Sequence, residues 1–297
     1  MVSIGILVRR AICAAALLAG SAFAQTAPFS DTYSGAPAGG GSCNSTYNIA
    51  GVEPAATGTY PVFVYMVGTS ETYNNASATE AVNRMASKGY VAATIQYGSS
   101  VFGSCSAIGS KASCAFNPAS AASAVSKLCG RGKADCSKGI VVAGFSQGSI
   151  MAILAKNYDG RVQAAYGLGA GVQYSTYDLR ACVANGNRTL PTSRLRAVDG
   201  EVDNFIGPTA TNVRSQFQEL TGMNCGTAAY GCLASNNSGW IIVHNAQVGD
   251  GSADHCYMRQ SGGCLGSQNS LDAGWKSGVQ DWELETNLNW LTTFTTK

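Results

Sequence analysis

The sequence predicts an α/β protein built on a doubly wound, mostly parallel sheet. From residue 60 onward, apolar runs of strand length alternate with helical patterns, and the run at residues 139–145 is of the kind buried on both faces of a parallel sheet. Strands separated by helices imply right-handed crossovers. In such sheets, ligands bind beyond the carboxyl ends of the strands. We therefore expect one domain, residues 43–297, of a size that a single α/β unit accommodates.

The first 24 residues predict a signal peptide that is cleaved after Ala24. A basic start ending in Arg9-Arg10 precedes an apolar stretch, and residues 21–24 supply the small side chains of a cleavage site. Ordinary secretion is favoured over twin-arginine export and over a retained N-terminal anchor, so we expect a secreted or periplasmic protein. Residues 25–42 are rich in small and turn-forming residues and predict a flexible lead-in.

The charge balance argues against nucleic acid as a partner. Charged residues make up 12% of the chain, and without the first 24 residues the chain has 17 basic and 17 acidic side chains. No cluster of Lys and Arg is available to neutralise a phosphate backbone. No later segment is long and apolar enough to span a membrane. We expect a monomer without a membrane span.

The cysteines predict disulfide bonds. Eleven cysteines are present; Cys13 lies in the signal segment, and an even number in an exported chain indicates pairing. Zinc is disfavoured because the chain has no C-x-x-C motif and only two histidines. Four short spacings favour local pairs and leave a fifth pair by elimination: Cys105–Cys114, Cys129–Cys136, Cys225–Cys232, Cys256–Cys264 and Cys43–Cys182.

The first half of the domain begins with an apolar strand at residues 60–66. Ser77 and Glu80 form a capping box that predicts the start of a helix, and Gly89 predicts its end. A second strand at residues 90–97 leads into a cysteine-bearing loop, which is followed by a helix at residues 118–130.

The second half repeats the alternation after the central strand. Trp282, Leu288 and Leu291 are expected to share the buried face of the closing helix. The predicted helices lie at residues 147–157, 210–220 and 281–294, and the predicted strands at residues 162–169, 194–199 and 239–246.

The candidate nucleophile is Ser146, in Gly144-Phe145-Ser146-Gln147-Gly148. In a chain with 36 glycines this pentapeptide is a weak signal by itself, but it lies where the central strand turns directly into a helix. Such a turn strains the serine backbone, and side chains two positions to either side would collide, so both places need glycine. The helix that begins at Gln147 directs its N–H groups and the positive end of its dipole toward the hydroxyl.

A serine hydroxyl needs a base, and the chain offers two histidines. His244 lies within the predicted strand 239–246 and is expected to be a packed core residue. His255 lies in the loop beyond that strand, on the same sheet edge as Ser146, and is the expected base. Asp250 and Asp254 of this loop are expected to be turn residues rather than calcium ligands.

The arrangement resembles the α/β-hydrolase family from about Tyr60 to the closing helix, and the G-F-S-Q-G turn is similar to those of cutinases and small carboxylesterases. The resemblance implies a triad in the order serine, acid, histidine, which reads Ser146, Asp203 and His255. In "LRAVDGEVDNF", Gly200 ends the strand and places Asp203 in the following loop, so Asp203 is expected as the acid rather than Asp199.

The resemblance also implies an oxyanion hole made by the backbone N–H of Gln147 and that of Gly68 or Thr69. The chain departs from the family pattern at three places: Val67 replaces the histidine of the usual His-Gly pair, Cys256 follows the base, and the acid lies between distant cysteines. The departures place cutinase membership in doubt, while the superfamily remains supported.

No large cap domain is predicted between residues 169 and 194. The segment carries Tyr174 and Tyr177, which either border an open site or pack beneath a disulfide-tied loop. We expect a secreted serine carboxylic-ester hydrolase that acts on small or polymeric esters through an acyl-enzyme, without cofactor or metal. A peptidase or amidase with the same triad and a catalytically silent binding module are the alternatives.

Overall fold

The computed structural model describes residues 25–35, 45–260, 264 and 268–297. The expected signal peptide and Cys43 lie outside the described residues. No helix in the described part of the chain is long and apolar enough to cross a membrane.

Nine strands of the described chain form one sheet in the order β1-β2-β4-β3-β5-β6-β9-β11-β10. The six strands from β4 to β11 run parallel to their neighbours, whereas β1 and β2 at one edge and β10 at the other are antiparallel. A separate hairpin consists of β7 and β8. The strands are β1 Thr26–Tyr33, β2 Tyr47–Pro54, β3 Val62–Met66, β4 Val91–Ile95, β5 Ile140–Phe145, β6 Val162–Leu168, β7 Gln173–Tyr174, β8 Tyr177–Asp178, β9 Leu195–Gly200, β10 Gly231–Leu233 and β11 Gly239–Val243.

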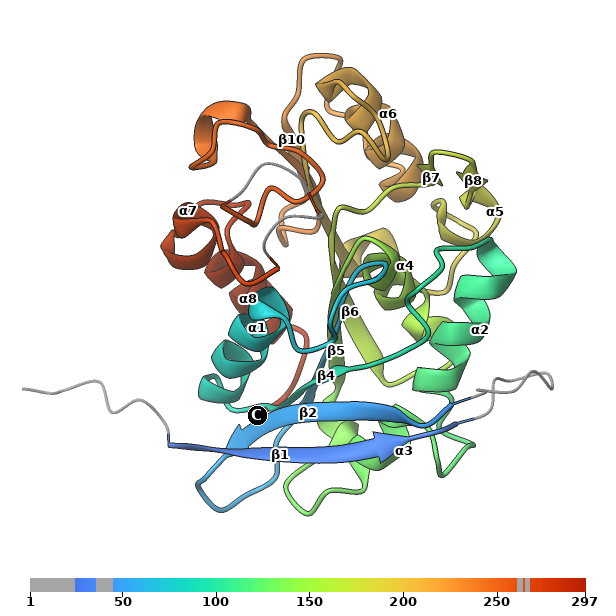
Figure 1. Cartoon of the computed structure of the whole chain (residues 1–297), viewed down its shortest axis with the longest axis vertical. Coiled ribbons are helices and arrows are strands. Elements are labelled where there is room, and N and C mark those ends of the chain that lie inside the picture. Colours follow the sequence, from blue (N-terminus) through green and yellow to red (C-terminus); the bar gives the residue numbers. More distant parts are fainter. Residues whose placement is uncertain (1–24, 36–44, 261–263, 265–267) are drawn as a thin grey trace, which may run out of the picture.

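Helices cover both faces of the sheet, as predicted. Figure 1 shows α1, α7 and α8 on one side of the edge-on sheet and α2, α4 and α5 on the other. The helices are α1 Ala76–Ser87, α2 Cys105–Phe116, α3 Ala124–Cys129, α4 Gln147–Leu154, α5 Arg180–Val183, α6 Ala210–Thr221, α7 Ala273–Ser277 and α8 Leu284–Thr292. The α/β class and the mostly parallel sheet are therefore confirmed.

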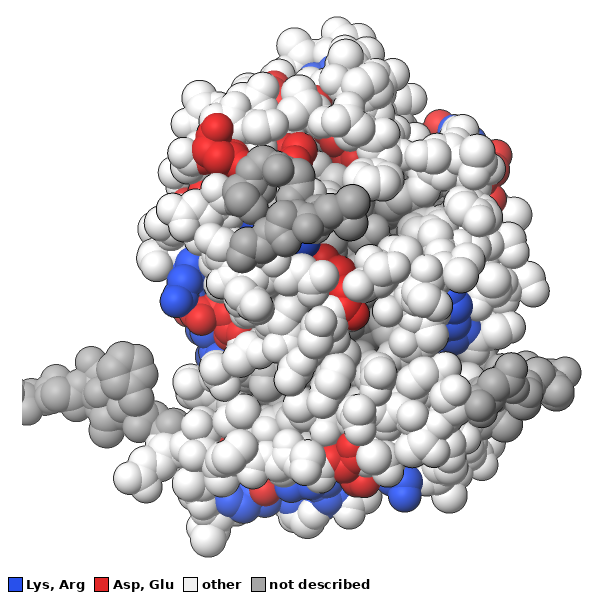
Figure 2. Space-filling model, in the orientation of Figure 1, with Lys and Arg blue, Asp and Glu red and all other residues white. Residues whose placement is uncertain are grey.

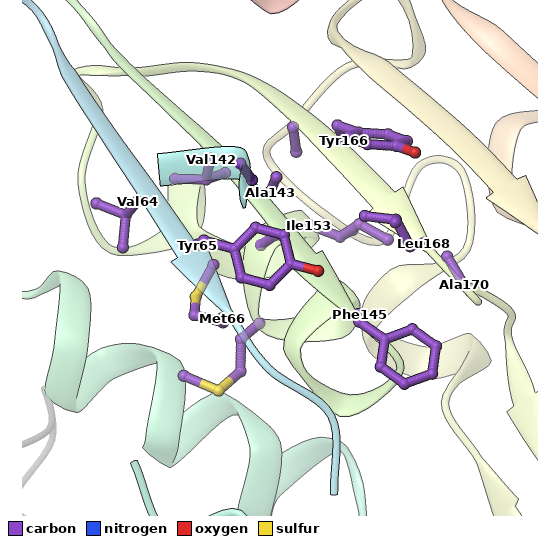
Figure 3. Packing of buried hydrophobic residues seen from close by; sticks show 14 of the residues in the cluster. Val64, Tyr65, Met66, Val142, Ala143, Phe145, Ile153, Tyr166, Leu168 and Ala170 are labelled. Carbon is purple, nitrogen blue, oxygen red and sulfur yellow. The ribbon is translucent and has the colours of Figure 1, made fainter. Parts of the chain in front are cut away.

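The core is formed where the central strands meet the helices. All residues of β3, β4 and β5 are buried, because these strands are covered on both faces. Figure 3 shows side chains of β3, β5 and β6, together with Ile153 of α4, packed into one cluster. Trp282, Leu288 and Leu291 are buried as expected.

Several predicted boundaries are wrong. Residues 26–33, expected in the flexible lead-in, form strand β1, and residues 105–116, expected as a loop, form helix α2. Helix α3 covers only the second half of the predicted helix 118–130. Asn75, not Ser77, caps α1: its side chain accepts the Ala78 N–H at 3.1 Å.

Three of the five expected disulfides are present: Cys129–Cys136, Cys225–Cys232 and Cys256–Cys264. The pairs Cys105–Cys114 and Cys43–Cys182 are wrong, because Cys105 pairs with Cys182 across 77 residues. Helix α2 separates Cys105 from Cys114 at its two ends, so these two cysteines cannot meet. Cys114 is also disulfide-bonded.

The topology creates a crevice at the carboxyl ends of β3 and β5. These neighbouring strands are parallel, but β3 is followed by α1 on one face of the sheet and β5 by α4 on the other. Ligands of open α/β sheets bind where the connections diverge in this way. Gly68 follows β3 and Ser146 follows β5, so the fold brings two expected site segments to this crevice.

Candidate functional site

Ser146 sits in a strained turn between β5 and α4. Its backbone has φ 52° and ψ −119°, a conformation that side-chain-bearing residues rarely adopt. A Cβ on Gly144 would lie 2.2 Å from the Gly148 carbonyl oxygen, and a Cβ on Gly148 would lie 2.2 Å from the Met66 carbonyl oxygen. Both glycines are therefore required by close backbone contacts, as the pentapeptide predicts.

Asp203 and His255 form a buried pair. The Nδ1 atom of His255 hydrogen-bonds the Oδ2 atom of Asp203, and both side chains are almost fully inaccessible to solvent. The Asp203 Oδ1 atom accepts the Phe205 N–H at 2.6 Å and the Ile206 N–H at 3.2 Å. The carboxylate is thus fixed by its own loop while its second oxygen orients the imidazole ring.

Close backbone packing brings the loops of this pair together. The Val202 N–H donates to the Ala253 carbonyl at 3.0 Å, and a Cβ on Gly200 would lie 1.9 Å from the same oxygen. Gly169, with φ +59°, admits the His255 ring: a Cβ there would lie 2.7 Å from the ring's Cε1 atom. The sequence pattern did not indicate this role for Gly169.

Asp199 lies behind the pair as a second buried carboxyl group. Its burial first, and then the charge of Asp203, raise its pKa well above the usual range. Burial would also raise the pKa of Asp203, but the charge of His255 and hydrogen bonds from His255 and Asp199 lower it below its ordinary value. Of the two carboxyl groups, Asp199 therefore keeps its proton to the higher pH and Asp203 is the more readily ionised.

Ser146 and His255 line one cavity of about 410 Å³. The Nε2 atom of His255 is buried and has no hydrogen-bond partner among the described residues. Ser146 is 7% exposed and lines the same cavity, but no hydrogen bond joins it to the His255 ring in the described part of the chain. The cavity wall consists of Thr69, Ser70, Glu71, Phe102, Phe145, Ser146, Tyr174, Ser175, Tyr177, Phe205, His255, Cys264 and Gln268.

The two candidates for the oxyanion loop differ in what their N–H groups do. The Gly68 N–H donates to the Glu71 side chain at 2.8 Å, so it is already committed. The N–H groups of Thr69 and Gln147 donate to no acceptor within the described part of the chain. Thr69 also lines the cavity. The geometry therefore favours Thr69 over Gly68 as the partner of Gln147.

A buried ion pair holds this loop in place. Glu71 Oε1 bonds the Arg259 guanidinium, while Glu71 Oε2 accepts from Gly68 and, at 3.1 Å, from the Asn75 side chain. Arg259 also donates to the Cys264 carbonyl at 2.9 Å. The pair joins the loop after β3 to the disulfide-closed loop that follows His255. Sequence reasoning missed both residues, because nothing in the spacing of Glu71 and Arg259 indicates that they meet.

The Gln147 side chain links three more segments. Its Nε2 atom donates to Thr69 Oγ1 at 3.2 Å and to the Val101 carbonyl at 2.9 Å, and its Oε1 atom accepts from Lys111 at 3.1 Å. The residue after the candidate nucleophile thus fixes the loop of Thr69 as well as the loop that carries Phe102.

Tyr174 and Tyr177 both line the cavity, so they border it rather than pack away from it. Between β6 and β9, the described chain forms only short elements, the hairpin β7–β8, α5 and a 3-10 turn; no large helical cap is present. Phe102 and Phe205 were missed as cavity residues, and Phe145 was noted only as part of the pentapeptide, because aromatic side chains far apart in sequence give no signal of a shared wall.

His244 is not the buried core residue that the sequence predicts. Strand β11 ends at Val243, and the His244 side chain is 45% exposed and stacked on the Tyr230 ring at 3.5 Å. It lines a separate cavity of about 700 Å³ beside β10 and β11. That larger cavity contains no serine beside a histidine, so it lacks the chemistry of the smaller one.

The acidic residues near His255 offer little to a metal ion. Asp250 and Asp254 accept N–H bonds from Ser252 and Cys256 in their own turns, at 3.0 and 2.7 Å. Ligand atoms of Asp199, Asp203 and His255 lie within 4.8 Å of one another. Here the Nδ1 atom of His255 already hydrogen-bonds the Asp203 carboxylate, so a hydrogen-bonded acid–histidine pair describes this cluster.

No protein-family model matches the chain, and no curated protein matches its sequence. Among solved structures, a hypothetical protein from Pseudomonas aeruginosa matches with a TM-score of 0.38 and 17% identity, over 55% of this chain. The match spans less than half, 47%, of that protein's chain. A likeness at this level supports no argument about fold family or function.

Proposed function

We propose that the protein is an exported serine hydrolase of the α/β-hydrolase type that cleaves carboxylic esters. The observation that carries the proposal is the convergence of Ser146, in a strained strand-to-helix turn, and the buried Asp203–His255 pair on one cavity. The chain order serine, acid, histidine and the glycines on both sides of Ser146 add to it. The described disulfides support an oxidising compartment.

The proposed reaction begins when Ser146 Oγ attacks the ester carbonyl carbon while His255 Nε2 takes the hydroxyl proton. The N–H groups of Thr69 and Gln147 hold the oxyanion. The tetrahedral intermediate collapses, the carbon–oxygen bond to the alcohol breaks, and the imidazolium donates its proton to the leaving alkoxide. Water then repeats the sequence on the acyl-enzyme and releases the acid. Asp203 keeps the imidazole oriented and balances its charge.

Ester hydrolysis is preferred over amide hydrolysis because of the cavity. Five of its thirteen described lining residues are Phe or Tyr and none is Lys or Arg, which favours an apolar ester over a polar peptide. In the view of Figure 2, most of the visible surface belongs to residues other than Lys, Arg, Asp and Glu. An uncharged, apolar ester fits these surroundings.

The test combines labelling with turnover. A fluorophosphonate should label Ser146, and the protein should hydrolyse vinyl acetate and p-nitrophenyl acetate but not the matching anilide. Labelling at another residue, or ester turnover that survives in Ser146→Ala, would contradict the proposal. Anilide cleavage at a comparable rate indicates an amidase, and absence of both labelling and turnover indicates a silent binding module.

A further inference from the structure

Aromatic side chains from distant segments gather around Ser146. Phe102 contacts Tyr174 and Tyr177, with ring centroids 4.7 and 5.4 Å apart. Phe205, from the loop after β9, contacts the His255 ring at 4.8 Å. All four rings line the 410 Å³ cavity that contains the candidate nucleophile. The surroundings of the scissile bond are therefore aromatic rather than merely apolar.

The segments that carry Phe102, Tyr174 and Tyr177 are joined by a disulfide bond. Phe102 lies three residues before Cys105 and Tyr177 five residues before Cys182, and these cysteines form a disulfide. The Tyr174 hydroxyl accepts the Gly171 N–H at 3.1 Å, so its polar atom is used within its own loop. Tyr174 is buried and offers the cavity its ring. This wall is thus fixed before any ligand binds.

Phe205 is fixed by the candidate acid itself. Its backbone N–H donates to Asp203 Oδ1 at 2.6 Å, which holds the Phe205 backbone beside the Asp203–His255 pair, and its ring contacts the His255 ring. Phe205 is nevertheless 48% exposed and Tyr177 37% exposed, although both are large apolar side chains. Exposed aromatic rings beside a cavity are typical of a binding surface.

The cavity contains no free charge that would select a charged ligand. Among its described lining residues other than His255, Glu71 is the ionisable acid, and it is paired with Arg259. Arg and Lys side chains are absent from the described lining. A carboxylate or ammonium group on the substrate would lose its hydration there without gaining a partner.

Resting on the esterase function proposed above, we infer that the substrate is an uncharged ester with an aromatic ring one or two bonds from the ester group. The ring packs between Phe205 and the wall of Phe102, Tyr174 and Tyr177. Aromatic rings gain from offset or edge-to-face contacts at centroid distances of about 4.5–7 Å, beyond the burial of their area. A saturated ring of the same size fills the same volume without this gain.

The test uses two matched ester pairs. Methyl phenylacetate is compared with methyl cyclohexylacetate, and benzyl acetate with cyclohexylmethyl acetate, so that each pair differs only in ring aromaticity. The kcat/KM of each ester is divided by its rate of alkaline hydrolysis, so that the ratio within a pair reports the fit of the ring rather than the reactivity of the ester. We expect the aromatic member to be preferred about 3- to 10-fold in at least one pair. The pair that shows the preference tells whether the acyl or the alcohol side occupies the aromatic wall.

Phe205→Leu and Tyr177→Leu keep an apolar side chain but remove a ring, and they should lower the aromatic-to-saturated ratio toward one while the saturated ester is still turned over. Val279→Ala, an exposed apolar residue beside the other cavity, is the control and should leave the ratio unchanged.

A wild-type ratio near one with good ester turnover overturns the inference and leaves the esterase function intact. A ratio unchanged in both ring variants also overturns it. Failure to hydrolyse any ester, vinyl acetate included, refutes the esterase function and with it this inference.

Discussion

Residue by residue, the site depends on a backbone conformation that its central side chain disfavours. Ser146 is held at φ 52° because β5 ends and α4 begins on either side of it. Residues with a Cβ carry an energetic cost of about 1–3 kcal/mol in such a region. A protein retains this cost at a buried turn only when the surrounding contacts over-determine it, as the Gly144 and Gly148 contacts do.

Two substitutions of Ser146 separate the effect of the strained backbone on stability from the effect of the hydroxyl on turnover. Ser146→Ala should reduce ester turnover by several powers of ten and leave stability within about 1 kcal/mol of wild type, because alanine keeps the strain. Ser146→Gly should be equally inactive but more stable than Ser146→Ala by about 1 kcal/mol. Turnover and urea unfolding of the three proteins check this. A glycine variant no more stable than the alanine variant would show that the turn is not strained.

The two buried carboxyl groups should respond oppositely to amide replacement. Asp203→Asn should cut turnover by up to about ten-thousandfold, since the amide favours the wrong histidine tautomer. Asp199→Asn replaces the carboxyl group whose pKa is raised and which does not hydrogen-bond His255 directly, so turnover should stay within a few-fold of wild type. Side-by-side kcat/KM measurements decide between them. A large loss in Asp199→Asn with a mild one in Asp203→Asn would exchange their roles.

Asp199→Asn should also change how stability depends on pH. The folded-state pKa of Asp199 is raised, so the folded protein retains a proton that the unfolded chain releases above about pH 4. The stability contribution of this carboxyl is therefore complete below about pH 4 and is lost as pH rises toward the folded-state pKa. The variant lacks this loss, so its Tm relative to wild type should rise from pH 4 to pH 8. A difference in Tm that is constant over this range would contradict the raised pKa.

The strand-to-helix elements of the central sheet were predictable because their signals are local. The apolar run at residues 139–145 and the glycines around Ser146 determine both β5 and the turn. Strand β1 was missed because its burial alternates and its sequence is polar, which is typical of an edge strand and equally of a loop. Helix α2 was missed because its three serines and one glycine weaken the local helical signal, whereas its packing on α4 is a tertiary contact that the sequence pattern does not show.

In the candidate site, too, the residues with a local sequence signal could be predicted and those that depend on long-range contacts could not. Ser146 and the Asp203–His255 pair could be predicted from a turn motif and from loop positions at one sheet edge. The cavity wall and the Glu71–Arg259 ion pair could not, because they depend on contacts between residues up to 188 positions apart. The disulfide Cys105–Cys182 was missed for the same reason, since short sequence spacing indicates a local pair only where the chain between can turn back.

The loop after β3 should depend on Glu71. Glu71→Ala leaves the buried Arg259 guanidinium unpaired and frees the Gly68 N–H, so we expect a loss of about 3–5 kcal/mol in the free energy of unfolding, with reduced turnover. Glu80→Ala is the matched control, because its ion pair with Arg84 lies on the surface of α1 and contributes at most about 1 kcal/mol. Urea unfolding measures both. Equal losses in the two variants would contradict a special role for the buried pair.

At the scale of the whole molecule, the disulfides differ in how much chain they close. Cys105–Cys182 closes 77 residues and joins the segments that carry Phe102 and Tyr177, whereas Cys129–Cys136 closes seven. In the chain-entropy description, the longer loop restricts the unfolded chain more. The long link therefore contributes both to overall stability and to the shape of the cavity.

Removing each bond by paired serine substitutions tests this. The Cys105→Ser/Cys182→Ser variant should lose about 4 kcal/mol in the free energy of unfolding, and the Cys129→Ser/Cys136→Ser variant about 2 kcal/mol. Only the first should also reduce kcat/KM for aromatic esters. If the short-loop variant is the less stable one, the disulfides act through native contacts rather than through the unfolded chain.

The balance of charges has a consequence for how the protein meets its substrate. The 17 basic and 17 acidic residues beyond position 24 balance, so the net charge produces no long-range attraction or repulsion, and charged side chains are few on the face shown in Figure 2. Ions in solution then have little to screen, and an uncharged ester is neither steered toward the cavity nor repelled from it. Encounter is therefore governed by ordinary diffusion at any ionic strength. We therefore expect the turnover of an uncharged ester by the proposed esterase to be the same at low and at high ionic strength.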